Sequence, residues 1–116
     1  MSYDVYFCDP VSKGVIEIED AHFMRGGTYK VGGSKELRLN ITYNYASNYG
    51  KHGFSIRDLD EKTAAEVIPE LDRIIGLLSD ETDPDYWKAV DGNAKRALIQ
   101  LRVMAKMRPD AIIEVD

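Results

Sequence analysis

The sequence contains few of the residues that mark cross-linked, secreted or membrane-spanning proteins. Cys8 is the only cysteine among 116 residues, so no disulfide can form within the chain, as is usual in a reducing compartment. No apolar run approaches the roughly 20 residues that a membrane-spanning helix needs. The opening stretch MSYDVYFCDP lacks the basic and apolar regions of a signal peptide. We therefore expect a cytoplasmic protein without a membrane partner.

Motifs that carry chemistry are equally scarce. The sequence has no paired cysteines, no histidines at metal-ligand spacing and no aspartate-rich calcium loop, so we expect neither a metal nor a cofactor. The Gly-Lys-Ser/Thr ending of a phosphate-binding loop is missing as well. Cys8, His22 and His52 are candidates for a nucleophile and a base, although a cysteine that ends an apolar strand is usually an inert core residue. The sequence thus favours binding over catalysis.

The charge is unevenly distributed along the chain. Its net value is −5, but residues 55–85 hold ten acids and three bases, whereas residues 86–108 hold six bases and one acid. The common interpretation of such a pattern is two solvated helix faces of opposite charge that attract each other. A pI near 5.0 argues against direct binding of nucleic acid, because dedicated nucleic-acid-binding domains are usually basic.

The first half of the sequence predicts β structure. Residues 3–8 and 15–18 resemble an opening hairpin, followed by a loop over residues 19–27. A short strand at residues 28–31 and a Gly-Gly turn lead into a long strand over residues 36–45. Alternation along that strand places five side chains on one face, namely Leu37, Leu39, Ile41, Tyr43 and Tyr45.

The second half predicts two helices and a last strand. Thr63 and Glu66 form a capping box ahead of apolar residues at helical spacing, with Pro69 just past the first turn. A second helix opens at residues 91–93 and ends before Pro109, and residues 112–115 can add an edge strand. We therefore predict a single α+β domain over residues 1–116, in which two helices cover a small antiparallel sheet of four to five strands.

The Gly-rich segment around Arg25 is the first candidate site. Arg25, Gly26 and Gly27 offer a guanidinium and unencumbered backbone amides, which suit a phosphate or a carboxylate, and Tyr29 follows in the next predicted strand. The alternative is a loop in which the glycines only allow a backbone geometry that other residues disfavour. In that case Arg25 forms an ion pair with a nearby acid.

The end of the long predicted strand is the second candidate. Arg38, Asn40, Thr42 and Asn44 alternate with the apolar residues and form an outward polar row. Tyr43 is expected in the core, whereas Tyr45 and Tyr49 lie where the strand ends and are expected to be exposed. Asn44, Tyr45 and Tyr49 are accordingly predicted to bind a ligand or a partner, since tyrosine is enriched in binding surfaces.

Two charged groups complete the candidates. Lys95 and Arg96 lie in the first turn of the second predicted helix, where the helix dipole disfavours a positive charge. They therefore require an anionic neighbour, either the acidic segment or a bound ligand. The acidic candidate surface comprises Asp80, Glu81, Asp83 and Asp85.

Several short motifs occur together in this chain. RGGTY, VGG, NITYNY, DYWKA, GNAKRAL and MRPD occur in that order between Arg25 and Asp110. In this order the chain resembles a group of small accessory proteins of phages and integrated mobile elements. The resemblance implies no catalytic residue; it implies a bacterial host cell and counter-defence by stoichiometric binding, as in anti-CRISPR proteins.

Two functions are compatible with these features. In the first, the acidic residues bind a bacterial defence protein, for example at the basic channel of a nucleic-acid-binding effector. In the second, Arg25, the Gly-Gly turns, Tyr45, Tyr49, Lys95 and Arg96 line a pocket that sequesters a small anionic nucleotide. A small nucleotide-processing hydrolase is a third, weaker alternative, and a homo-oligomer is compatible with each of them.

Overall fold

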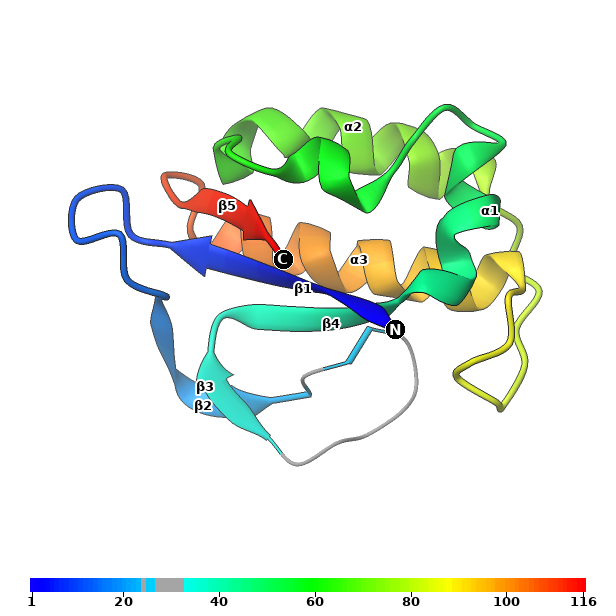
Figure 1. Cartoon of the computed structure of the whole chain (residues 1–116), viewed down its shortest axis with the longest axis horizontal. Coiled ribbons are helices and arrows are strands. Elements are labelled where there is room, and N and C mark those ends of the chain that lie inside the picture. The colour runs from blue at the N-terminus through cyan, green and yellow to red at the C-terminus, as the bar shows by residue number, and fades with distance from the viewer. Residues whose placement is uncertain (24, 27–32) are drawn as a thin grey trace.

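The computed structural model describes residues 1–23, 25–26 and 33–116, and this part of the chain forms an α+β structure (Figure 1). Its strands are β1 (Ser2–Cys8), β2 (Glu17–His22), β3 (Ser34–Glu36), β4 (Arg38–Thr42) and β5 (Ile112–Val115). Its α-helices are α1 (Ala46–Gly50), α2 (Ala64–Leu77) and α3 (Asp91–Met107), and 3-10 turns cover Tyr43–Tyr45 and Ile56–Leu59. The predicted strand over residues 28–31 and the start of its turn lie outside the described residues.

The strands form two sheets, so the predicted single sheet of four to five strands is wrong. One sheet has the order β4-β1-β5 and the other pairs β2 with β3, both antiparallel. Of the predicted opening hairpin, the structure contains the turn and one antiparallel β-bridge, between Cys8 and Val15. Because β1 has a partner on both edges, the returning chain cannot pair along it. Residues 17–22, mostly assigned to a loop from the sequence, instead form β2.

The predicted long strand over residues 36–45 is interrupted at both ends. Leu37 links the two sheets, since its carbonyl accepts from Phe7 N at 3.0 Å and its amide donates to Ile16 O at 2.7 Å. At the other end the Thr42 hydroxyl accepts from Asn44 N at 3.2 Å and turns the chain into the 3-10 turn. The exposed loop predicted for residues 46–53 therefore begins with helix α1. Local hydroxyl bonds of this kind compete with strand pairing.

Helices α2 and α3 agree with the sequence prediction. The capping box forms as expected, with Glu66 N donating to Thr63 Oγ1 at 3.2 Å and Thr63 N donating to Glu66 Oε2 at 2.8 Å. Pro69 lies within α2 without ending it. The apolar residues that recur at helical spacing along α3 form a buried stripe: Ala94, Ala97, Leu98, Leu101, Met104 and Ala105. These side chains join one core with the inner face of β1 and β4, and α2 packs alongside α3 (Figure 1).

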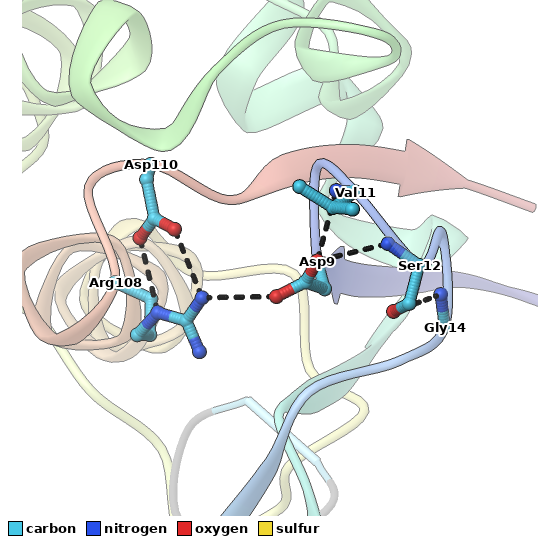
Figure 2. Close-up of polar contacts among 6 residues, drawn as sticks. All are labelled: Asp9, Val11, Ser12, Gly14, Arg108 and Asp110. Carbon is cyan, nitrogen blue, oxygen red and sulfur yellow. Dashed lines mark hydrogen bonds and ion pairs between the residues drawn. The ribbon is translucent and has the colours of Figure 1, made fainter.

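Arg108 fastens the end of α3 to the turn after β1 (Figure 2). Its guanidinium contacts both oxygens of Asp110 at 3.0 and 2.9 Å and reaches Asp9 Oδ2 at 3.4 Å. Asp9 also accepts from Val11 N at 2.8 Å and Ser12 N at 3.0 Å. These backbone amides, with Arg108, hold the pKa of Asp9 below its usual range. The cluster lies at the C-terminal end of β1, which is the end of the sheet distant from the N-terminus.

Candidate functional site

The tyrosines predicted to be exposed are internal. Tyr45 and Tyr49 have no exposed surface, so the prediction of their exposure is wrong, whereas Tyr43, expected in the core, is partly exposed. The Tyr45 hydroxyl donates to the Tyr86 carbonyl, and the Tyr49 hydroxyl donates to Ala94 O at 2.8 Å. Burial raises the pKa of both phenols. Tyr45 thus joins the α1 region to the loop before α3, and Tyr49 joins it to the first turn of α3, so neither ring offers a binding surface.

Tyr86 completes the edge of strand β4. Its hydroxyl donates to Asn40 O at 3.2 Å and accepts from Thr42 N at 3.3 Å, as a neighbouring strand would. Thr42 is buried, although the sequence placed it in the outward row with Arg38, Asn40 and Asn44. Asn44 is exposed, and its side chain donates to Trp87 O at 2.8 Å. The position of Trp87 is thus set by its neighbours in the chain and by Asn44.

Gly26 fixes the position of Arg25 beside β4. Gly26 N donates to Asn40 O at 2.9 Å, so this amide is not available to an anion as the sequence prediction required. A Cβ added at Gly26 would lie 2.6 Å from Ala97 Cβ, so only glycine fits between β4 and α3. The backbone of Arg25 forms an isolated parallel β-bridge with Asn40. The glycine therefore has a structural role here; Gly27 and Tyr29 lie outside the described residues.

Arg25 and Trp87 form the centre of an exposed surface. The Arg25 Cζ atom lies 4.9 Å from the centroid of the Trp87 ring, and Trp87 is 41% exposed. Beside them is a hollow of about 240 Å³ on the face of the sheet that points away from the core. Its lining residues are Met1, Ser2, Asp4, Arg25, Arg38, Asn40 and Trp87. Two guanidiniums, one carboxylate and one indole ring thus share a small concave surface.

Strands β1 and β4 arrange the polar side chains of this hollow. Asp4 faces Asn40 across the ladder, and Tyr6 faces Arg38. The Asn40 amide donates to Asp4 Oδ1 at 3.0 Å and to Ser2 Oγ at 2.8 Å. The Arg38 Cζ atom lies 5.7 Å from the Tyr6 ring centroid. Each arginine is therefore positioned by an aromatic ring, which favours a cation at that position.

Lys95 and Arg96 lie on another part of the surface. They line a separate hollow of about 260 Å³ next to the start of α3. Lys95 Nζ contacts Asp80 Oδ1 at 2.7 Å and Leu78 O at 3.3 Å. The anionic neighbour that the sequence required for Lys95 is therefore Asp80. The structure does not bring Lys95 and Arg96 to the same hollow as Arg25.

The acidic candidate surface has internal roles. Asp83 Oδ1 accepts from Asp85 N at 2.9 Å, and Asp85 Oδ1 accepts from Trp87 N at 3.1 Å. Asp80 pairs with Lys95, which holds the pKa of Asp80 below its usual range. Farther along the helices Arg102 contacts Asp72 at 2.7 Å. Two ion pairs, Asp80–Lys95 and Asp72–Arg102, thus connect the acidic and the basic segments, as the common interpretation of the pattern predicts.

Asp91 is a polar centre that sequence reasoning missed. Its Oδ1 atom accepts from Asn48 Nδ2 and Lys51 Nζ, each at 2.9 Å, and its Oδ2 atom accepts from Ser79 N at 3.2 Å. Burial alone would raise the pKa of Asp91, but these donors lower it to about 2. The contacts connect α1, the end of α2 and the start of α3, so the role of Asp91 is structural.

The nucleophile and base candidates do not form a visible catalytic pair. Cys8 is buried, and burial followed by the nearby Glu114 raises the pKa of its thiol, which keeps it protonated. His22 Nε2 lies 2.6 Å from Glu36 O within the β2–β3 sheet. His52 follows α1, and its carbonyl lies 3.5 Å from the Arg73 guanidinium. No contact among these three residues occurs in the described part of the chain.

Trp87 could have been found from the sequence by its rarity, because it is the only tryptophan and stands in a polar connection between helices. Among the residues that the structure describes, no cluster of histidine, cysteine, aspartate or glutamate could hold a metal ion. No helix in that part is long and apolar enough to cross a membrane. Comparisons of the chain with protein-family models, with curated proteins and with solved structures find no match.

Proposed function

We propose that this chain is a non-catalytic binding protein that inhibits a bacterial defence protein by forming a stoichiometric complex with it. The observation that carries this proposal is the exposed Trp87 ring under the Arg25 guanidinium, at the rim of a polar hollow. Tryptophan and arginine are the residues most enriched among those that dominate protein–protein binding energies. The resemblance to phage and mobile-element proteins supplies the biological context, a counter-defence role of the anti-CRISPR type.

Sequestration of a small anionic nucleotide is the weaker alternative. Its proposed pocket required Arg25, Tyr45, Tyr49, Lys95 and Arg96 to face one cavity, but the tyrosines are buried and the cations line different hollows. The hollow at Arg25 measures about 240 Å³, whereas small-molecule sites usually enclose roughly 300 to 1,000 Å³. A single side chain from a partner protein matches its size better.

The test compares two variants that each remove one exposed hydrophobic side chain. Tagged protein is purified from a bacterial host with an active defence system, and native mass spectrometry measures the mass and stoichiometry of the complex. Trp87→Ala is expected to weaken the complex by about 2 kcal/mol or more, roughly thirty-fold in Kd. Leu77→Ala, which alters a similarly exposed residue at the end of α2, serves as the control and is expected to retain the complex.

The same experiment separates the Trp87 surface from the acidic surface. Charge reversal of all four candidate acids would also disturb the loop, because Asp83 and Asp85 accept hydrogen bonds from its backbone. Glu81 is exposed, so Glu81→Lys is the cleaner variant. If Glu81→Lys abolishes the complex and Trp87→Ala does not, the acidic residues are the working surface. A complex that survives both substitutions would show that the partner binds neither surface. The absence of any complex with the unmodified protein, or a turnover of substrate by the purified protein, would refute the proposal.

A further inference from the structure

The hollow beside Trp87 carries an excess of positive charge. Arg25 and Arg38 contribute two guanidiniums to its lining, and Asp4 is the carboxylate among them. Asp4 Oδ1 is held by the Asn40 amide at 3.0 Å. Glu36 forms a long ion pair with Arg38, with its Oε1 atom 3.9 Å from Arg38 Nε, beyond hydrogen-bond distance. The side chains that line the hollow carry more positive than negative charge, which is complementary to an anion.

The two arginines are held in a form that suits a carboxylate. Arg25 lies over the Trp87 ring and Arg38 over the Tyr6 ring. A guanidinium that lies over an aromatic ring keeps its N–H donors at the edge of its own plane. Its five N–H groups are more than one internal partner uses. Planar donors of this kind bind carboxylates through two parallel hydrogen bonds. The exposed edge of Trp87 can in turn contact the methylene groups that carry a side-chain carboxylate.

We infer that this hollow is the anchor site for an acidic side chain of the partner protein, a glutamate or aspartate bound between Arg25 and Arg38. The inference rests on the proposed function and deepens it, because it assigns the chemistry of the partner's contact. A carboxylate complements the excess of positive charge among the side chains that line the hollow. A phosphate, which carries more charge and three or more oxygens, would also approach Asp4 and be repelled by it.

The inference can be tested with a defined probe before any partner is known. Protein labelled with ¹⁵N is titrated with an acetylated and amidated Ala-Glu-Glu-Glu-Ala peptide, and signals of the Trp87 indole N–H and of the Arg25 and Arg38 Nε–H groups are followed by NMR. We expect saturable shifts at these three groups that weaken as salt is added. The glutamine analogue of the peptide is expected to produce none.

Matched arginine variants separate the site from general charge. Arg38→Gln is expected to weaken peptide binding about ten-fold, as loss of charge-assisted hydrogen bonds implies. Arg57→Gln is the control, because Arg57 also lies over a ring, 5.3 Å from the Tyr3 centroid, but does not line the hollow. Equal losses for the two variants would overturn the inference, as would an absence of shifts at millimolar peptide.

Further outcomes separate the inference from the proposed function. If inorganic phosphate or adenosine monophosphate shifts the same signals at lower concentration than the peptide does, the occupant is a small anion and the inference is overturned. If the peptide fails to bind while Trp87→Ala still removes the complex from cells, the anchor chemistry is wrong and the protein-binding function stands. If the peptide binds at these groups while the unmodified protein yields no complex from cells, the anchor chemistry is supported and the proposed function falls.

Discussion

Gly26→Ala is the substitution whose effect follows most directly from the packing of the site. The added Cβ would lie 2.6 Å from Ala97 Cβ, 3.0 Å from Ala97 Cα and 3.3 Å from Leu39 Cδ2. Carbon atoms attract each other best at about 3.5–4.0 Å, so the first two distances are strongly repulsive. Ala97 is fully buried in the middle of α3, and its backbone cannot move without displacing the helix.

We expect Gly26→Ala to destabilise the protein by about 1–3 kcal/mol, the usual range for overpacking in a core. Ala97→Gly alone is expected to cost about 1 kcal/mol through helix propensity. In the double variant the Cβ–Cβ clash is gone, so the two effects should combine to less than their sum by about 1 kcal/mol. The contact of the new Cβ with Ala97 Cα remains and limits the rescue.

Urea unfolding followed by circular dichroism measures each free energy of unfolding in this cycle. The structural argument also predicts a functional effect, because displacement of Gly26 moves Arg25 away from Trp87 and should weaken any complex that depends on the pair. A loss below about 0.5 kcal/mol for Gly26→Ala, which is the range of ordinary surface changes, would refute the reasoning. Strict additivity of the two substitutions would refute it as well.

Three further substitutions test the core. Tyr86→Phe leaves Asn40 O and Thr42 N of β4 without their hydroxyl partner and is expected to cost about 1–3 kcal/mol in urea unfolding, with Trp87 fluorescence reporting any local change. The pKa of Asp91 is lowered to about 2, so its contribution to stability is at most about 2.5 kcal/mol, present above pH ~4 and lost as the pH falls towards 2. Asp91→Asn should flatten this part of a stability–pH curve, and an unchanged slope would contradict the assignment. Leu98→Ala should cost roughly 2–5 kcal/mol, because the side chain is fully buried in the stripe of α3, and a value near zero would show that α3 is not packed as described.

Helices α2 and α3 could be predicted from the sequence because their signals are local, whereas α1 was assigned to a loop. The capping box of Thr63 and Glu66, the apolar spacing that follows and the stop before Pro109 each involve residues within a few positions of one another. The edge strand β5 was also predicted, since three of its four residues are β-branched. The coarse α+β class follows from these elements together.

The sheet topology was not predictable in the same way, because it depends on contacts between distant parts of the chain. Alternation alone predicted that β1 would pair with the next apolar run, but β4 and β5 occupy both its edges. The Thr42 hydroxyl ends the long strand early. Tyr45 then lies in the core, where its hydroxyl donates a hydrogen bond to the Tyr86 carbonyl. Periodicity carries no information about such a partner some forty residues away.

The candidate site shows the same division between local and distant information. Arg25 was identified from its Gly-Gly neighbours, although Gly26 serves packing against Ala97 and its amide is bound to Asn40. Trp87 was not identified, because its relation to Arg25 exists only after Tyr86 and Asn44 place the loop beside β4. Tyr45 and Tyr49 are buried and Lys95 is paired with Asp80, whereas Arg25 brings a cation onto the partly exposed Trp87 ring beside one hollow. That coincidence is the physical reason to direct the first functional experiments there.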